Sequence, residues 1–439
     1  MMINLEDLYG RWFTKHQLTA EERALAQELS PQQDRCHRCA TPYQEEYKLP
    51  NDAYYCRECI LLGRIRSDEP LYYFPQQDFP KQDVLKWKGQ LTPYQTEISE
   101  GLYQQIQNNQ ATLVHAVTGA GKTEMMYQAV AQIIENGGAV CLASPRIDVC
   151  IELYKRLQKE FSCPISLLHG ESKPYFRTPL AIATTHQLLK FYHAFDLLLI
   201  DEVDAFPYVD NPMLYHAVEN ALKPEGVPIF LTATSTDELD KMVGKGRLVK
   251  LQLLRRFHGN PLIVPKKIWM QSFQASLAKN TLPTICLESI RKQRISQFPL
   301  LVFAPQIKTG QQIKRILEQF FPDETIGLVS SQTEERLEMV EKFRQGEIKI
   351  SVATTILEGG VTFPCVDVFV FEAHHRLYNS SSLVQISGRV GRSMDRPTGN
   401  LFFFIEETNH AIEKSIQEIK DMNKEAGYAK VHLMPRGSR

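Results

Sequence analysis

The segment from residue 116 to 123 reads Ala-Val-Thr-Gly-Ala-Gly-Lys-Thr and has the residue types needed to bind the phosphates of a nucleotide. Glycines let backbone N–H groups converge on an anion at the start of a helix, where the helix dipole also favours negative charge. The side chain of Lys122 would reach the β- and γ-phosphates, and the hydroxyl of Thr123 would bind Mg²⁺. The residues expected to bind the nucleotide here are Thr118, Gly119, Ala120, Gly121, Lys122 and Thr123.

Apolar residues on both sides of this segment predict the strand, loop and helix order that a phosphate-binding loop requires. A short buried strand is expected over 113–116, and apolar residues at helical spacing follow until Asn136-Gly137. The alternative is a glycine-rich turn that only joins a strand to a helix, and Ala116 stands where the general pattern has glycine.

Two adjacent carboxylates farther along the chain favour nucleotide chemistry over a simple turn. Asp201 and Glu202 follow the apolar run 197–200, which is typical of a central strand. Carboxylates at the end of a buried strand cost free energy unless a cation or a reaction uses them. We expect Asp201 to bind Mg²⁺ together with Thr123, and Glu202 to polarise the attacking water.

Four of the nine cysteines are patterned in a way that indicates a metal site. Cys36 and Cys39 are separated by two residues, and so are Cys56 and Cys59, with sixteen residues between the pairs. Each pair offers two thiolates to one cation, and four protein ligands leave no open position. A structural zinc ion is therefore expected, whereas the other five cysteines lie in apolar surroundings and are expected to pack in the core.

Composition agrees with an intracellular enzyme of two or three domains. The chain has 439 residues, of which 43% are hydrophobic and 23% charged, and a formal net charge of -1. Such a charge excludes a uniformly basic surface, so any nucleic acid must bind in a local groove. No stretch is long and apolar enough to span a bilayer, and the polar N-terminus lacks a secretory signal, so we expect a cytoplasmic protein.

Apolar runs alternate with helical patterns twice along the chain, which predicts two parallel sheets with helices on both faces. Only the first set has a phosphate loop, which suggests a nucleotide site in the cleft between two lobes. The strands expected in the first set are 113–116, 139–143, 180–184, 197–200 and 229–231, and those in the second are 300–303, 325–329, 350–353, 366–371 and 401–405.

The second set contains a candidate for stabilising charge on the γ-phosphate. Residues 385–392 read Gln-Ile-Ser-Gly-Arg-Val-Gly-Arg, so Arg389 and Arg392 would share one face of a helical segment, with Gln385 nearby. Guanidinium groups suit charge that is spread over phosphoryl oxygens, and such arginines are catalytic in many nucleotide hydrolases. The alternative is a solvated basic helix.

Taken in order, these motifs resemble those of superfamily 2 helicases and translocases over residues 91 to about 400. That resemblance implies two RecA-like lobes, an adenine contact from Gln95, coupling through Thr232-Ala233-Thr234, and contacts to sugar and phosphate that do not read base sequence. The residues that it assigns to nucleic-acid contact are Ser144, Pro145, Arg146, Thr184, Thr185, Thr354 and Thr355.

A closer resemblance, over nearly the whole chain, is to the ComFA family of late competence proteins of Gram-positive bacteria. It is carried by the four cysteines before the motor and by the segments 85–93, 115–124 and 201–207. The resemblance implies an ATPase that is stimulated by single-stranded DNA and that acts in the import of transforming DNA. It also implies two partners, the membrane DNA-uptake channel and a phosphoribosyltransferase-like ComFC protein, and hence a place at the inner face of the membrane.

The predicted fold is thus α/β, with two RecA-like parallel-sheet lobes preceded by a small four-cysteine zinc module. Residues 1–30 are expected to be helical, with Leu5, Leu8 and Trp12 as an apolar face. The connector is basic and aromatic, and it would either stack on a single strand or be pinned to the next domain by its aromatic residues. The expected divisions are 1–30, the zinc module 31–62, the connector 63–90, lobe 1 at 91–268, lobe 2 at 269–430 and a tail at 431–439 that resembles the remnant of a protease site.

Three functions are consistent with these residues. The first is an ATP-driven translocase of single-stranded DNA in competence. The second is a replication-restart, repair or RNA helicase, and the third is a zinc-bearing adaptor at the uptake channel that does not hydrolyse ATP. One departure from the family pattern, Gly359 where arginine is common, bears on how hydrolysis is coupled to movement.

Overall fold

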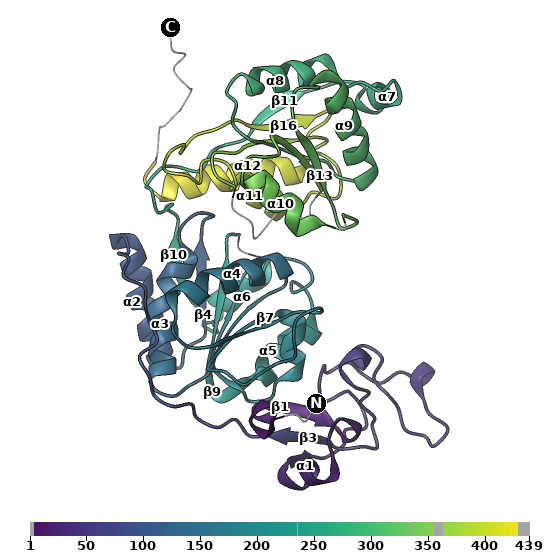
Figure 1. Ribbon diagram of the computed structural model, residues 1–439, viewed down its shortest axis with the longest axis vertical. Coiled ribbons are helices and arrows are strands. Elements are labelled where there is room, and N and C mark those ends of the chain that lie inside the picture. Colours follow the sequence, from purple (N-terminus) through teal and green to yellow (C-terminus); the bar gives the residue numbers. More distant parts are fainter. Residues whose placement is uncertain (1–3, 235, 334, 355–362, 429–439) are drawn as a thin grey trace. The chain divides into compact units, whose positions relative to one another are not determined.

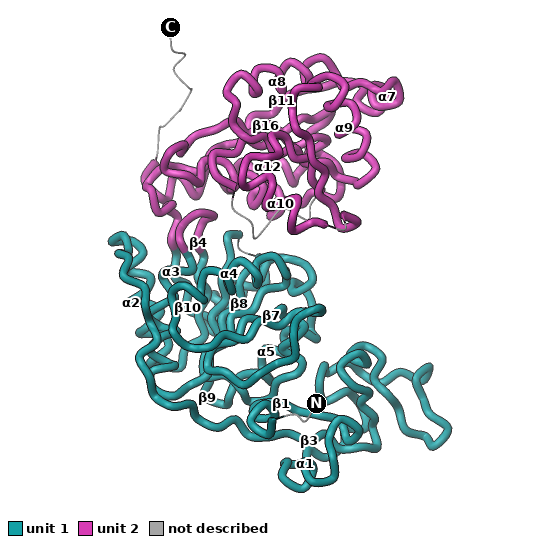
Figure 2. The backbone as a smooth tube through the Cα atoms, viewed as in Figure 1, with its two compact units in different colours: residues 1–115, 122–252 teal, residues 116–121, 253–439 magenta. Residues whose placement is uncertain are grey.

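The computed structural model describes residues 4–234, 236–333, 335–354 and 363–428. The chain divides into two compact units, which Figure 2 distinguishes by colour. Unit 1 consists of residues 1–115 and 122–252, and unit 2 of residues 116–121 and 253–439. The unit boundary after residue 252 differs from the expected lobe boundary after residue 268.

Unit 1 is built on a seven-stranded sheet with the order β10-β4-β9-β8-β5-β7-β6. Figure 1 labels β4, β7, β9 and β10 of this sheet. The pairings β4–β9, β9–β8, β8–β5, β5–β7 and β7–β6 are all parallel. All five strands predicted for this lobe are present, whereas β6 and β10 were not predicted. The strands are β4 (Thr112–Ala116), β5 (Val140–Ser144), β6 (Ile165–Leu168), β7 (Leu180–Thr184), β8 (Phe195–Ile200), β9 (Leu222–Thr232) and β10 (Val249–Leu253).

Helices follow the strands of this sheet, as expected for parallel connections. Helix α2 packs beside α3, and α5 packs beside the 3₁₀ helix η5. Helix α3 begins at Lys122, within the segment predicted to bind phosphate. The helices are α2 (Pro93–Gln107), α3 (Lys122–Glu135), α4 (Ile147–Glu160), η5 (Thr185–Lys190), α5 (Pro212–Ala221) and α6 (Asp237–Gly244).

The N-terminal part of unit 1 forms a separate three-stranded antiparallel sheet with the order β1-β3-β2. Residues 1–30 were expected to be helical, and here the structure differs. The side chains of Trp12 and Phe13 are both buried but belong to different apolar clusters, as consecutive residues of a strand covered on both faces do. The elements are η1 (Leu5–Leu8), β1 (Arg11–Thr14), η2 (Lys15–Gln17), α1 (Ala20–Leu25), β2 (Gln27–Leu29), η3 (Glu45–Tyr47), η4 (Ile60–Leu62) and β3 (Leu71–Phe74).

The connector 63–90 is packed onto unit 1 by its aromatic residues. It contributes strand β3, and the N–H of Phe79 donates to the carbonyl of Gly137 at 2.8 Å. The guanidinium of Arg177 lies 3.9 Å from the ring centroid of Phe79, and the ring of Trp87 meets that of Tyr127 edge-on at 5.6 Å. These are the contacts that the pinned-loop interpretation of the connector requires.

Unit 2 is built on a six-stranded sheet with the order β11-β16-β15-β12-β14-β13, in which every pairing is parallel. The five predicted strands are present, and the edge strand β11 was not predicted. The strands are β11 (Lys266–Trp269), β12 (Leu300–Phe303), β13 (Ile326–Val329), β14 (Ile350–Ala353), β15 (Asp367–Val370) and β16 (Leu401–Ile405), and the helices are α7 (Phe273–Ala278), α8 (Thr284–Arg294), α9 (Ile307–Phe320), α10 (Arg336–Arg344), α11 (Ser380–Ser387) and α12 (His410–Glu425).

The central strand β12 shows why the strands of this sheet are continuous apolar runs in the sequence. Leu301 and Phe303 belong to one apolar cluster, and Leu300 and Val302 belong to another. Because side chains alternate across a strand, the two clusters lie on opposite faces of the sheet, so both faces are covered. The predicted fold class, with two parallel-sheet lobes and a four-cysteine cluster, is therefore confirmed.

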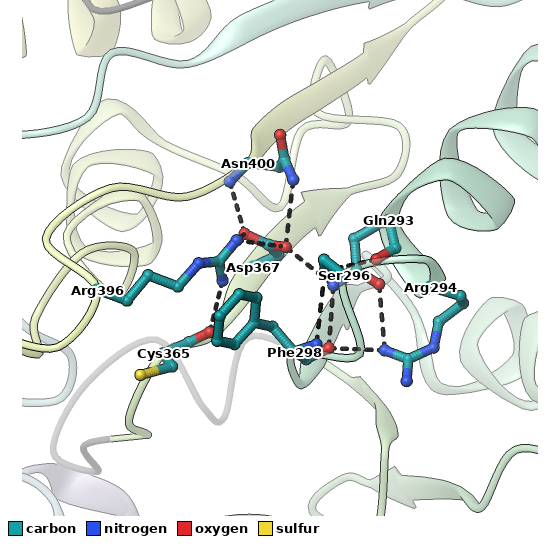
Figure 3. Close-up of polar contacts among 8 residues, drawn as sticks. All are labelled: Gln293, Arg294, Ser296, Phe298, Cys365, Asp367, Arg396 and Asn400. Atoms are coloured by element: carbon teal, nitrogen blue, oxygen red, sulfur yellow. Dashed lines mark hydrogen bonds and ion pairs between the residues drawn. The ribbon is translucent and has the colours of Figure 1, made fainter. Parts of the chain in front are cut away.

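A fully buried carboxylate at the start of β15 ties the ends of three elements together (Figure 3). Asp367 accepts hydrogen bonds from the Arg396 guanidinium at 2.8 and 3.0 Å, from the Gln293 amide at 2.9 Å and from the Asn400 backbone at 2.6 Å. Arg396 also lies over the ring of Phe298, 3.8 Å from its centroid. The carboxylate thus joins helix α8, strand β15 and the chain before β16.

We expect Asp367→Ala to destabilise unit 2 by about 3–5 kcal/mol, because the change leaves a mostly buried guanidinium without its counter-charge. The measurement is denaturant-induced unfolding followed by circular dichroism. Asp395→Ala is the matched control, since Asp395 is an exposed carboxylate one residue from Arg396. Equal unfolding midpoints for the two variants would contradict the importance of the buried carboxylate.

Candidate functional site

The predicted phosphate loop connects β4 to α3 in the expected order of strand, loop and helix. Gly119 and Gly121 have φ angles of +80° and +78°, which side chains with a Cβ atom rarely adopt. The N–H of Ala120 donates to the carbonyl of Val117 at 3.1 Å, which closes the turn. Both glycines are thus required by the backbone conformation of the loop.

The predicted carboxylates lie in the turn directly after β8. The N–H of Asp201 donates to the carbonyl of Ala143 at 2.8 Å, so β5 fixes the start of this turn. The Nζ atom of Lys122 lies 3.5 Å from Oδ1 of Asp201, and the N–H of Glu202 donates to the same oxygen at 2.9 Å. The structure therefore brings Lys122 and Asp201 together, as a shared nucleotide and Mg²⁺ site requires.

Glu202 has an unusual backbone conformation and an unexpected partner. Its φ angle of +55° lies in the left-handed region, which costs a residue with a Cβ atom about 1–3 kcal/mol. Its carboxylate oxygen Oε2 lies 3.0 Å from Nε of Arg146, a residue predicted to contact nucleic acid. Burial raises the pKa of Glu202, and the guanidinium of Arg146 opposes that shift.

The same turn is joined to strand β9 through Asp204. The hydroxyls of Thr232 and Thr234 donate to the two oxygens of the Asp204 carboxylate, at 2.8 and 2.5 Å. A ring nitrogen of His115 lies 3.2 Å from the carbonyl of Ala233, and burial lowers the pKa of this histidine. The turn with the carboxylates is thus held by β5 on one side and by the Thr-Ala-Thr segment on the other.

The residues predicted to contact nucleic acid in lobe 1 lie at the same edge of the sheet as the carboxylates. Ser144 ends β5 and Thr184 ends β7, and the carboxyl ends of parallel strands meet at one edge. The side chains of Ser144, Thr184 and Thr185 are buried. The hydroxyl of Thr185 is buried and has no hydrogen-bond partner among the described residues.

The structure does not test the predicted ligand contacts of Gln95, Thr354 and Thr355. The side-chain oxygen of Gln95 accepts a hydrogen bond from the N–H of Thr92 at 2.9 Å and caps helix α2, so its contact with adenine remains a prediction from resemblance. Thr354 is buried directly after β14. Thr355 and Gly359 lie outside the described residues.

The arginines of the second lobe lie just beyond a helix rather than on one. Helix α11 ends at Ser387, and the chain turns through Gly391, which has a φ angle of +69°. Arg389 is buried, with its guanidinium 5.7 Å from the ring centroid of Phe363, and Nε of Arg392 donates to the carbonyl of Gly388 at 2.9 Å. Gln385 is also buried, near the end of α11.

Lys122 belongs to unit 1, whereas Arg389 and Arg392 belong to unit 2. Their joint action on one nucleotide therefore stays a prediction. Within unit 2, the hydroxyl of Thr118 donates to the carbonyl of Gly388 at 3.3 Å. The loop with Gly119 and Gly121 (the glycine loop) therefore contacts the segment with Arg389 and Arg392 (the arginine segment).

Arg256 is a residue of this region that the motifs did not reveal. Its guanidinium is buried and donates to the carbonyls of Val390, Gly391 and Gly388 at 2.8, 2.6 and 3.2 Å. Burial lowers the pKa of Arg256 to about 9. The N–H of the next residue donates to the carbonyl of Gly119 at 3.1 Å, so this segment contacts both the glycine loop and the arginine segment.

The four patterned cysteines converge on one point. Their sulfur atoms all lie within 4.8 Å of one another, with Sγ–Sγ distances of 3.6 Å for Cys36 and Cys59 and 3.5 Å for Cys39 and Cys56. A tetrahedral ion with zinc–sulfur bonds of ~2.3 Å requires sulfurs about 3.8 Å apart. The donor set and its spacing therefore fit zinc.

This cysteine cluster is part of the core of unit 1 rather than a separate appendage. All four cysteines belong to the apolar cluster that contains Trp12, Leu189 and Leu214. The indole N–H of Trp12 donates to the carbonyl of Leu189 at 2.7 Å, and a ring nitrogen of His216 on α5 lies 3.1 Å from the carbonyl of His37. Loss of the cluster would therefore disturb helix α5 and its surroundings.

The remaining cysteines mostly pack in the core, as expected. Cys141, Cys150, Cys163 and Cys286 are buried, and Cys365 is only partly buried. Among the described residues, no helix is both long enough and apolar enough to cross a membrane.

Three family models match successive parts of the chain. The "Competence protein ComFA N-terminal domain" matches residues 4–73, the "Type III restriction enzyme, res subunit" matches residues 88–237, and the "Helicase conserved C-terminal domain" matches residues 281–394. The first match covers the cysteine cluster, and the second covers the phosphate loop and the carboxylates.

Two curated relatives are similar over almost their whole length. Competence protein ComFA of Streptococcus pneumoniae is 64% identical over 432 residues, which is 97% of this chain and 100% of the relative. Competence protein ComFA of Bacillus subtilis is 31% identical over 96% of this chain and 92% of the relative.

Solved helicase structures share the fold. The helicase Lhr of Mycobacterium smegmatis, bound to ssDNA and AMP-PNP, has a TM-score of 0.59 and 17% identity, covering 76% of this chain and 48% of Lhr. The DEAD-box helicase Mss116, bound to ssRNA and UDP-BeF, has a TM-score of 0.56 and 17% identity, covering 76% of this chain and 78% of that one. At this identity the likeness supports the fold alone.

We expect protein purified without chelator to hold about one zinc ion per chain, and Cys36→Ser to lose the ion and unfold unit 1 at a lower temperature. The physical reason is that the ion and the apolar cluster stabilise the same region. Elemental analysis and thermal unfolding measure the two effects.

The matched control for this prediction is Cys163→Ser, which changes a buried thiol of unit 1 outside the cluster. This variant should keep its zinc. Wild-type protein without zinc, or a Cys36→Ser variant that retains a full equivalent, would contradict a four-thiolate site.

Proposed function

The chain belongs to the ComFA family of competence proteins, and from that membership and the site in unit 1 we propose that it is an ATP-driven motor that moves single-stranded DNA during natural competence. The observation that carries the proposal is the pairing of Lys122 with Asp201 at 3.5 Å, between a glycine loop and a turn with two carboxylates. A loop that only joined a strand to a helix would not need a lysine beside a carboxylate that is only 21% exposed.

In the proposed reaction, the phosphate loop and the turn with the two carboxylates bind and orient the nucleotide. The loop amides and Lys122 hold the phosphates, and Thr123 and Asp201 hold Mg²⁺, which supplies positive charge next to the reacting phosphoryl group. Glu202 orients the attacking water and accepts its proton. Gln95 is the proposed contact to the adenine base.

The second lobe supplies charge to the same reaction. Arg389 and Arg392 stabilise the negative charge that spreads over the γ-phosphoryl oxygens in the transition state, and Gln385 helps to orient the water. Arginines of this kind are typically worth ~10³–10⁵ in turnover. ATP would then favour closure of the lobes, and hydrolysis would release them.

Single-stranded DNA is the proposed polymer. The segments that contact DNA follow the strands of both lobes. They bind sugar and phosphate, so movement does not depend on base sequence. The proposed contact residues are Ser144, Pro145, Arg146, Thr184, Thr185, Thr354 and Thr355. Arg146, one of these residues, forms a salt bridge with Glu202, with Nε and Oε2 3.0 Å apart.

The zinc module and the biological partners complete the proposal. Zinc held by the four cysteines stabilises the N-terminal part of unit 1 and leaves no position for chemistry. The protein works on the cytoplasmic side, at the inner face of the membrane, with the DNA-uptake channel and a ComFC-like protein. These partners follow from family membership rather than from any contact in the chain.

We expect Lys122→Ala to lower ATP turnover by about 10²-fold or more, because it removes the cation that pairs with the phosphates. The measurement is turnover at fixed salt with added single-stranded DNA, duplex DNA or RNA. Lys159→Ala, an exposed lysine on α4, is the matched control and should behave as wild type.

Selective stimulation of the wild-type enzyme by single-stranded DNA supports the proposal. Stimulation mainly by RNA would replace it with an RNA helicase. Absence of turnover with every polymer would leave a zinc-bearing adaptor with a motor fold.

A further inference from the structure

The salt bridge between Arg146 and Glu202 joins two residues to which the sequence assigned different tasks. Arg146 was assigned to nucleic acid and Glu202 to water, yet their Nε and Oε2 atoms lie 3.0 Å apart. The two side chains are 20% and 14% exposed, so the pair is largely shielded from solvent. An anion that approaches Arg146 would therefore meet a guanidinium that already serves a carboxylate.

The backbones on both sides of this pair are fixed, so only the side chains can rearrange. Arg146 is the N-cap residue of α4, its N–H donates to the hydroxyl of Ser144 at 3.3 Å, and its carbonyl accepts from Cys150 at 3.2 Å. Glu202 follows Asp201, whose N–H is bonded to β5. A rotation of either side chain is enough to break the pair.

The location of Arg146 favours a phosphate as the competing partner. Arginine binds phosphate and carboxylate with the same fork of N–H groups, so one guanidinium cannot offer its best geometry to both. The N-terminal end of α4 carries partial positive charge, and its N-cap residue supplies no side-chain cap. A phosphodiester at this point would gain from the helix end and the guanidinium together.

The pair also restrains the chemistry of Glu202. A carboxylate bound to a guanidinium is a weaker acceptor for a proton from water, since its negative charge is already neutralised. The turn holds the backbone of Glu202 in the left-handed region, with a φ angle of +55°. This backbone conformation sets the direction of the side chain. Release of Arg146 would leave the carboxylate in place and more basic.

We propose that Arg146 is a positioning residue that holds Glu202 in an idle arrangement until a phosphate of single-stranded DNA takes the guanidinium. This inference rests on the proposed function, in which Glu202 orients the attacking water. It explains stimulation by DNA through one side-chain contact within unit 1. In this arrangement a DNA phosphate and the Glu202 carboxylate compete for the guanidinium of Arg146. Each therefore weakens the contact of the other with Arg146.

The first test is the turnover of Arg146→Gln, with and without saturating oligo-dT. Turnover without DNA should rise by about fivefold or more, and the ratio of stimulated to unstimulated turnover should fall by a similar factor. Arg146→Lys keeps the positive charge but loses the planar set of N–H groups. Its turnover without DNA should therefore lie between those of wild type and Arg146→Gln. Arg156→Gln is the control, since Arg156 lies on the same helix and pairs with Glu124 at 3.3 Å.

The second test measures binding and does not depend on turnover. Glu202→Gln should bind fluorescent oligo-dT more tightly than wild type, by about fivefold or more, because it frees Arg146. The same substitution made in Arg146→Gln should bring no gain. This double-mutant cycle separates the pair from a general loss of negative charge near DNA.

The outcomes distinguish the inference from the function on which it rests. Wild-type turnover that oligo-dT does not stimulate would overturn the proposed function, and the inference with it. Stimulated wild type, with an unchanged stimulation ratio in Arg146→Gln and no gain in Glu202→Gln, would overturn the inference alone. Equal losses of basal and stimulated turnover in Arg146→Gln would mean that Arg146 supports the catalytic geometry instead.

Discussion

The constraint on which unit 1 depends is the pair of carboxylates at the end of its central strand. A carboxylate in such a place is stable only if positive charge is close, since the desolvation penalty is several kcal/mol per ion. Lys122 and Arg146 supply that charge from the first residue of α3 and the residue before α4. Both positions follow strands of the same sheet, and β5 lies directly beside β8. The strand order thus brings the two cations to the two anions.

The cysteine cluster imposes a second constraint, which acts in the N-terminal part of the same unit. The four thiols share an apolar cluster with Tyr208 and Leu214, which follow the carboxylate turn along the chain. A metal ion bound by these thiols would therefore stabilise the same region as the burial of apolar surface. The N-terminal sheet adds to this through Trp12, whose indole N–H reaches into the core of the lobe. The four-cysteine cluster is thus part of the same core as helix α5 of unit 1.

The motifs and the parallel sheets could be predicted because each depends on residues close together in sequence. Glycines at positive φ, carboxylates after an apolar run and paired cysteines all leave local patterns. The strand at Trp12 could not be predicted, because its second face is buried by residues far along the chain. Neither the salt bridge from Arg146 nor the carbonyl contacts of Arg256 has a local pattern, since both join segments distant in sequence. The two strands β10 and β11 lie at sheet edges, where the apolar pattern is weak.

The claim that this chain is a motor is tested most directly by movement on DNA. Streptavidin bound to either end of a biotinylated single strand is a barrier that a translocating protein removes. The account predicts displacement from one end, dependent on ATP and absent when a non-hydrolysable analogue replaces it. Hydrolysis of ATP on the same DNA with streptavidin retained at both ends would contradict the account.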